Sequence, residues 1–170
     1  MVSRTIKPWN ALPFFQGLTA QNKLCREKGF KCVPVSGLEG METAIASMQN
    51  HPNLIMVAEN AAGFTELANT PHVTKYRTVF IAMRHKHDDM TARQNCMDII
   101  FEIHRQFCSK LIQEDTRLKE NYQYLDTRIT LQEVSKYLVP DTAICMFELG
   151  VNTFIDLEPN PDEWITETSN

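Results

Sequence analysis

The sequence predicts an α+β fold, in which a mainly antiparallel sheet carries one long helix across one face and smaller helices at its N-terminal side. Three observations support this prediction. Residues 73–83 combine β-branched and aromatic side chains over the length of a long strand. Residues 90–118 repeat apolar side chains at helical spacing. Residues 125–131 and 143–157 are extended stretches that we expect to pair as an antiparallel hairpin.

The composition predicts one globular domain. Of 170 residues, 43% are hydrophobic and 22% are charged, which suits a single core. We assign residues 1–158 to this domain and residues 159–170 to an extended acidic tail. The formal net charge of -4, without a basic run, argues against binding to duplex nucleic acid, and no stretch resembles a membrane span or a secretory leader. Five cysteines without a Cys-x-x-Cys pair predict reduced, buried thiols in a cytosolic protein.

The first helix is predicted over residues 9–28. Asn10 suits its N-cap, and Pro13 lies in its first turn, where a missing N–H costs little. Gly29 is a natural residue for its C-terminal end.

A strand, a short helix and a second strand are expected next. Residues 30–35 suit a strand near a sheet edge, because Pro34 cannot donate to a strand ladder. We predict a turn over residues 36–40, a helix over 41–50, and a strand covered on both faces over 54–58. Such a unit can form a parallel pair through a right-handed crossover.

The connection over residues 59–71 is rich in turn-forming residues and is long for a loop. Phe64 and Leu67 lie inside it and need burial. We therefore expect this loop either to be functional or to contact a partner.

The long helix opens at Asp88 and Asp89, whose carboxylates suit a helix start. We expect Phe101 to lie in the core beneath the sheet and His104 to be a core histidine with one satisfied nitrogen. The predicted apolar face of this helix consists of Met97, Ile100, Phe101, His104, Phe107, Cys108, Leu111 and Ile112.

The last strands follow this helix. Residues 125–131 alternate apolar and polar side chains, as a half-buried strand does. The strand over residues 143–157 is interrupted at Gly150, where we expect a bulge or a bend. In the tail, Trp164 is the one large side chain available as an anchor.

One cluster has the composition of a chemical site. His85, His87 and Asp88, together with His51, are the candidates for a small metal-dependent hydrolase. The spacing does not match the H-x-H-x-D-H metal motif, and capping of a helix explains both Asp88 and Asp89. We therefore predict no catalytic, cofactor-binding or metal-binding residues and no enzymatic activity.

A leading helix, a strand carrying Tyr76-Arg77-Thr78-Val79-Phe80-Ile81-Ala82-Met83, a long helix and a closing hairpin form a pattern over residues 5–164. This pattern resembles the tail-terminator and tail-completion proteins of long-tailed bacteriophages. The unit over residues 30–58 departs from it. Members of that family form hexameric rings that cap the tail tube and join it to the head–tail connector. The resemblance implies a structural subunit whose partners are itself and other tail or connector proteins, in a virion assembled in the host cytoplasm.

Apolar side chains in peripheral segments are the candidate contacts with these partners: Trp9, Phe14, Phe64, Leu67 and Trp164. The sequence leaves three classes of function open: an assembly subunit, a metal-dependent hydrolase, and a substrate-binding or regulatory α/β module. We predict the first.

Overall fold

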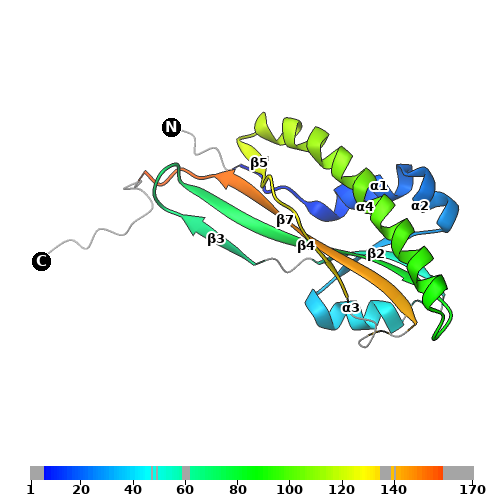
Figure 1. The fold of residues 1–170 in the computed structure, drawn as a ribbon. Coiled ribbons are helices and arrows are strands. Elements are labelled where there is room, and N and C mark those ends of the chain that lie inside the picture. Colours follow the sequence, from blue (N-terminus) through cyan, green and yellow to red (C-terminus); the bar gives the residue numbers. More distant parts are fainter. Residues whose placement is uncertain are drawn as a thin grey trace, which may run out of the picture.

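The computed structural model describes residues 6–46, 48, 50–58, 62–134, 139 and 141–158. Within them the helices are α1 (Ala11–Gln21), α2 (Lys23–Lys28), α3 (Gly37–Ala46) and α4 (Met90–Lys119). The strands are β1 (Lys31–Val35), β2 (Asn53–Ala58), β3 (Gly63–Glu66), β4 (His72–Arg84), β5 (Gln123–Leu125), β6 (Thr130–Glu133) and β7 (Thr142–Phe154). The predicted α+β class is confirmed (Figure 1).

The described strands form one mixed sheet in the order β1-β2-β4-β7-β5, with β3 paired to β4 and β6 paired to β7. β1 and β2 are parallel, joined through α3, and the other pairs are antiparallel. β4 and β7 pair along their whole length, from His72 opposite Phe154 to Arg84 opposite Thr142. The predicted edge position of the strand containing Pro34 is confirmed, because β1 begins the strand order.

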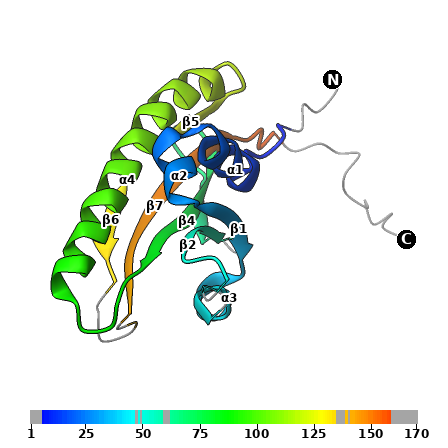
Figure 2. The same ribbon diagram turned by 90° about the vertical axis from the view of Figure 1, so that its right-hand side faces the viewer.

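Helices lie on both faces of the sheet, but unequally. α1, α2 and α4 lie on one face, and α3 lies on the other face near β1 and β2 (Figure 2). Side chains of β2 divide between the two layers: Ile55 and Val57 join the core beneath α1 and α4, whereas Leu54 and Met56 join the core beneath α3. The predicted strand covered on both faces is therefore confirmed.

One end of the sheet extends beyond α3 (Figure 1). We call this end the arm. It consists of β3, β5 and the paired ends of β4 and β7, residues 72–78 and 148–154. β3 pairs with β4 at residues 72–75, whereas β2 pairs with it at residues 79–83.

The first predicted helix is two helices, so the expectation of one continuous helix is wrong. Asn22 separates them with an extended backbone, and its side chain accepts a hydrogen bond from the Cys25 N–H at 2.9 Å, capping α2. Its amide also donates to Oε1 of Gln106 at 2.6 Å, which holds the break against α4. Asparagine is among the best N-cap residues, and this explains the restart. The predicted end caps, Asn10 and Gly29, are confirmed.

Two predictions between β1 and β4 are corrected. The expected turn over residues 36–40 is part of a helix, since α3 begins at Gly37 and ends at Ala46 rather than at residue 50. A parallel β1–β2 pair needs a crossover, and here a helix that starts directly after β1 supplies it. The expected loop over residues 59–71 contains β3, whose four residues are exposed and therefore lack the apolar pattern of a buried strand.

The predicted apolar face of α4 is confirmed in part. Met97, Ile100, Phe107 and Leu111 are buried, whereas two other predicted members are exposed. Phe101 is 38% exposed and Ile112 is 73% exposed, whereas Ile103 is fully buried. The buried row also contains Arg93 and Glu114, each held by hydrogen bonds. Because two charged residues lie in the buried row, a count of apolar side chains shifts the predicted face toward the adjacent row of the helix, which includes Phe101 and Ile112.

The strand expected over residues 125–131 is two short strands, β5 and β6, which both pair with β7 as the predicted antiparallel partner. β7 itself pairs with β4 without interruption through Gly150, so the expected bulge in this strand is wrong. A Cβ at Gly150 would collide with Oδ2 of Asp126 and crowd Tyr76. Glycine at this position therefore leaves room for the Asp126 carboxylate and the Tyr76 ring beside β7. Trp164 and the predicted tail lie outside the described residues.

Candidate functional site

The histidine-rich segment before α4 is a helix start. Asp89 is the N-cap, and its side chain accepts a hydrogen bond from the Ala92 N–H at 2.8 Å, as predicted for a capping carboxylate. Asp88 does not cap. It lies at positive φ with its carboxylate 3.2 Å from Nε2 of His87, and both side chains are largely exposed.

The other candidate ligands have different surroundings. His85 Nδ1 lies 2.9 Å from the Lys86 carbonyl oxygen, and Nε2 of His51 lies 3.2 Å from Nζ of Lys31. In the described part of the chain, no three His, Cys, Asp or Glu side chains are grouped so as to hold a metal ion. The buried Nε2 of His85 has no hydrogen-bond partner among the described residues.

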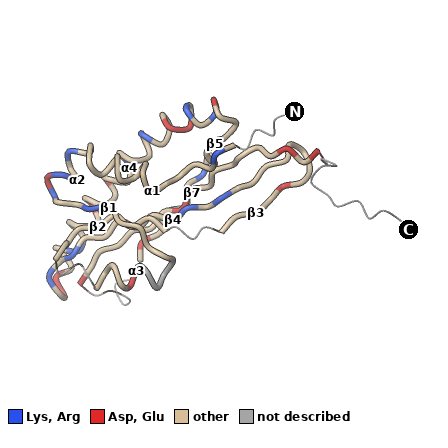
Figure 3. Tube along the Cα trace, turned by 180° about the vertical axis from the view of Figure 1, so that it is seen from behind, with Lys and Arg blue, Asp and Glu red and all other residues tan. Residues whose placement is uncertain are grey.

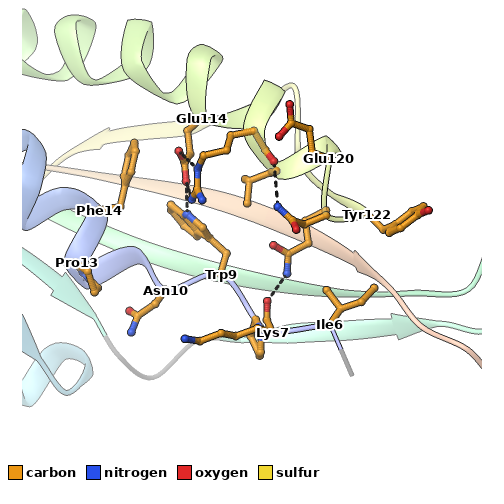
Figure 4. A pocket seen from close by; sticks show the side chains of 14 residues that line it. Ile6, Lys7, Trp9, Asn10, Pro13, Phe14, Glu114, Glu120 and Tyr122 are labelled. Atoms are coloured by element: carbon orange, nitrogen blue, oxygen red, sulfur yellow. Dashed lines mark hydrogen bonds and ion pairs between the residues drawn. The ribbon is translucent and has the colours of Figure 1, made fainter. Parts of the chain in front are cut away.

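A hollow of about 970 Å³ lies between the segment before α1 and the end of α4 (Figure 4). Trp9 donates from Nε1 to Oε1 of Glu114 at 3.0 Å, and Arg117 donates to both oxygens of Glu114. These contacts, with Arg117 first, hold the pKa of Glu114 below its ordinary value. The carboxylate is fully engaged and anchors the N-terminal segment.

The arm carries a row of aromatic rings on the sheet face that α3 covers only at the other end. We call this row the aromatic face. Its members come from four strands: Phe64, His72, Tyr76, Tyr124 and Phe154. Successive side chains alternate across a strand, so His72 and Tyr76 point to the same side as Phe80, which packs in the core beneath α3. The register places the other three rings on this side too.

The rings form a continuous series. The centroid of Phe64 lies 6.2 Å from that of His72 and 6.3 Å from that of Tyr76. The centroid of Tyr124 lies 6.5 Å from that of His72 and 5.8 Å from that of Phe154. These separations are typical of aromatic pairs that stabilise one another.

A polar network ties the strands of the arm together. Thr74 Oγ1 donates to Oδ1 of Asn152 at 2.5 Å, and the Asn152 amide donates to Oδ1 of Asp126 at 2.7 Å. Thr74 and Asn152 are buried, so each hydrogen bond satisfies a group that water cannot reach. The network fixes β4, β7 and the residue after β5 relative to one another.

The sequence-predicted contact residues fall into three groups. Phe64, 49% exposed, belongs to the aromatic face, and Leu67, 70% exposed, follows β3. Trp9 is buried in its own subunit, with Phe14 packed beside it at a centroid distance of 5.5 Å. Trp164 lies outside the described residues.

Sequence reasoning missed the other four rings of the aromatic face. They are far apart in the chain, and only the strand register brings them together. The one available signal was the repetition of ring side chains on the same parity of strand positions in residues 72–76.

Comparison of the chain with protein-family models and with curated proteins finds no match. Among the helices of the described part of the chain, none is both long and apolar enough to cross a membrane.

Proposed function

We propose that this protein is a structural assembly subunit of a bacteriophage tail. Copies of the chain pack against one another in a ring that terminates the tail tube and joins it to the head–tail connector. The identity of the assembly follows from the resemblance in element order, and the surface that performs the packing is the arm.

The observation that carries this proposal is the aromatic face. Five rings lie on a part of the sheet beyond α3, and Phe64 is half exposed. Aromatic side chains supply much contact area with few rotatable bonds, and they are enriched at the centres of protein interfaces. An aromatic surface held rigid by a buried polar network suits a permanent contact with another folded protein.

The β3 edge adds a second means of contact. All four residues of β3 are exposed, and in the described part of the chain β4 is its one strand partner. An edge strand with free N–H and C=O groups can accept a strand from another chain. Because Phe64 belongs to both the edge and the aromatic face, one partner can engage both.

Self-association of the purified chain tests this proposal. We expect sedimentation to show concentration-dependent assembly, and electron microscopy to show closed rings rather than filaments, since only a rotation that closes gives a ring. Phe64→Ser with Leu67→Ser should weaken association about tenfold or more, because truncation of a central anchor of an interface costs about 2 kcal/mol or more.

Phe101→Ser with Ile112→Ser is the matched control. These residues have similar exposure but lie on the outer side of α4. We expect this pair to leave association unchanged. Equal weakening by both pairs, or a wild-type chain that stays monomeric at every concentration, would count against the proposal.

A further inference from the structure

The opposite face of the arm carries a basic hollow. Lys75 and Arg77 lie two positions apart on β4, so both side chains are on the side of the sheet where α1 and α4 pack. Figure 3 shows lysine and arginine positions of β4 in blue along the strand. They border a hollow of about 370 Å³ whose other lining residues come from β3 and β4: Gly63, Phe64, Thr65, Val73 and Thr74.

Arg77 is half-buried, and the described residues offer its guanidinium no carboxylate. Of the two described arginines that are not exposed, Arg93 pairs with Glu133 at 2.5 Å, whereas Arg77 has no carboxylate within ion-pair distance among the described residues. The Arg77 guanidinium donates one hydrogen bond, to the Tyr76 carbonyl oxygen at 3.0 Å. A partly desolvated guanidinium is stabilised when an anion meets its remaining donors.

Lys75 borders the hollow and is exposed. Gly63 lies directly opposite Lys75 in the β3–β4 register. A Cβ at Gly63 would collide with the Thr74 carbonyl oxygen, so this position requires glycine. None of the described residues that line the hollow is acidic, so its two cations face no carboxylate there.

The chain itself contains a segment of complementary charge. Residues 159–170 include three acidic residues, Asp162, Glu163 and Glu167, and no lysine or arginine. Trp164 follows the acidic pair directly. The described chain reaches Glu158 just after β7, a strand of the arm, so this segment continues from the arm that carries the hollow.

We propose that Lys75 and Arg77 are the acceptor site for the acidic segment 159–170 of a neighbouring copy of this chain. The proposal rests on the ring described above, because a head-to-tail ring needs two different, complementary patches on each subunit. The acidic segment is one patch and the basic hollow is the other. Two cations are too few for a duplex phosphate backbone, which is bound through many such contacts.

Charge reversal in the full-length chain tests the proposal. The acceptor variant carries Lys75→Glu and Arg77→Glu, and the donor variant carries Asp162→Lys and Glu163→Lys. Each should weaken ring assembly about tenfold or more at low salt, since each places like charges together. Lys23→Glu with Arg26→Glu reverses two exposed charges on α2 and is the matched control, which we expect to assemble like wild type.

Mixing the two variants distinguishes a neighbour from the same chain. In a ring where the two variants alternate, every contact is complementary again, so assembly should return to within about threefold of wild type. Recovery in a chain that carries all four substitutions, but not in the mixture, would show docking within one chain and overturn the assignment to a neighbour.

Other outcomes also decide the matter. If the wild type and both variants form rings equally well, the docking of segment 159–170 is overturned, but the proposed ring stands. If the wild type is monomeric, the docking and the ring are both overturned. An acceptor variant that weakens assembly, beside a donor variant that assembles normally, would show that the hollow binds a group other than segment 159–170 and would overturn the docking. If Arg77→Glu lowers the melting temperature, Lys75→Gln with Arg77→Gln tests the same contact with less disturbance.

Discussion

The indole Nε1 of Trp9 donates a hydrogen bond to Oε1 of Glu114 at 3.0 Å, joining the segment before α1 to the last part of α4. Both residues are buried, and Arg117 completes the hydrogen bonding of the carboxylate. Trp9, a predicted partner contact, is therefore buried within its own chain. The contact also holds the N-terminal segment beside β5, where Gln123 donates to the Lys7 carbonyl oxygen.

Trp9→Phe tests this anchor. The substitution keeps a ring but removes the donor, and it leaves a buried carboxylate oxygen with one partner fewer. We expect the free energy of unfolding in urea to fall by about 1–3 kcal/mol. In a Glu114→Gln background the effect of Trp9→Phe should change, because the two residues interact directly. Strictly additive effects would argue against the contact.

Stability should fall as the solution is made acidic, and His104 and Glu114 are two of the groups that cause the fall. Burial lowers the pKa of His104 from its ordinary 6.5, so its contribution is complete above that pH and is lost as pH falls through the lowered value. The Arg117 hydrogen bond lowers the pKa of Glu114 from its ordinary 4.5. The stability that Glu114 contributes is therefore complete above pH 4.5 and is lost as the pH falls through the lowered pKa.

Urea denaturation between pH 7 and pH 3 measures these two contributions. His104→Gln should flatten the dependence just below pH 6.5, and Glu114→Gln should flatten it below pH 4.5, each leaving the other contribution in place. His104 packs edge-on against Phe147 with ring centroids 4.9 Å apart, so a charged imidazole there is poorly solvated. A profile that rises on acidification would contradict both assignments.

The position of α4 predicts a contrast between two of its residues. Ile103→Ala opens a cavity at a fully buried position and should cost about 2–5 kcal/mol. Phe101→Ala removes a side chain that is 38% exposed, and we expect a cost near 1 kcal/mol. Thermal melting of the two variants measures the difference. If Phe101→Ala lowers the melting temperature more than Ile103→Ala does, Phe101 lies in the core, as the apolar pattern predicts.

Local patterns predicted the elements well wherever one periodicity dominated. The cap at Asp89, the edge strand with Pro34 and the doubly covered strand β2 all follow from short-range chemistry. The α4 face follows only in part, because Arg93 and Glu114 are buried with partners that lie far away in sequence: Glu133 and Trp9.

The aromatic face could be predicted only in part. Phe64 was identified because a large apolar side chain stood among turn-forming residues. The sequence does not reveal that Tyr124 and Phe154 lie on the same face as Phe64. That arrangement depends on the strand order, in which β3 pairs with β4 and β5 pairs with β7. The predicted strand over residues 125–131 is wrong for a similar reason, because no local signal marks the break between β5 and β6.

Gly150 gives a final prediction about the arm. Gly150→Ala would drive a Cβ into Oδ2 of Asp126 and against Tyr76, in a region held by the Asn152–Asp126 hydrogen bond. We expect a loss of about 1–3 kcal/mol, because neither the buried network nor the strand register can give way freely.

Gly17→Ala is the matched control for this prediction. Gly17 lies within α1 and has no atom within 4 Å of the position that a Cβ would take. Replacing a helical glycine with alanine in open space should stabilise the protein by about 0.5–1 kcal/mol. Thermal melting should therefore shift in opposite directions for the two variants. If Gly150→Ala also stabilised the protein, Asp126 would not lie against β7. That result would contradict the packing of Asp126 and Tyr76 around Gly150 in the arm.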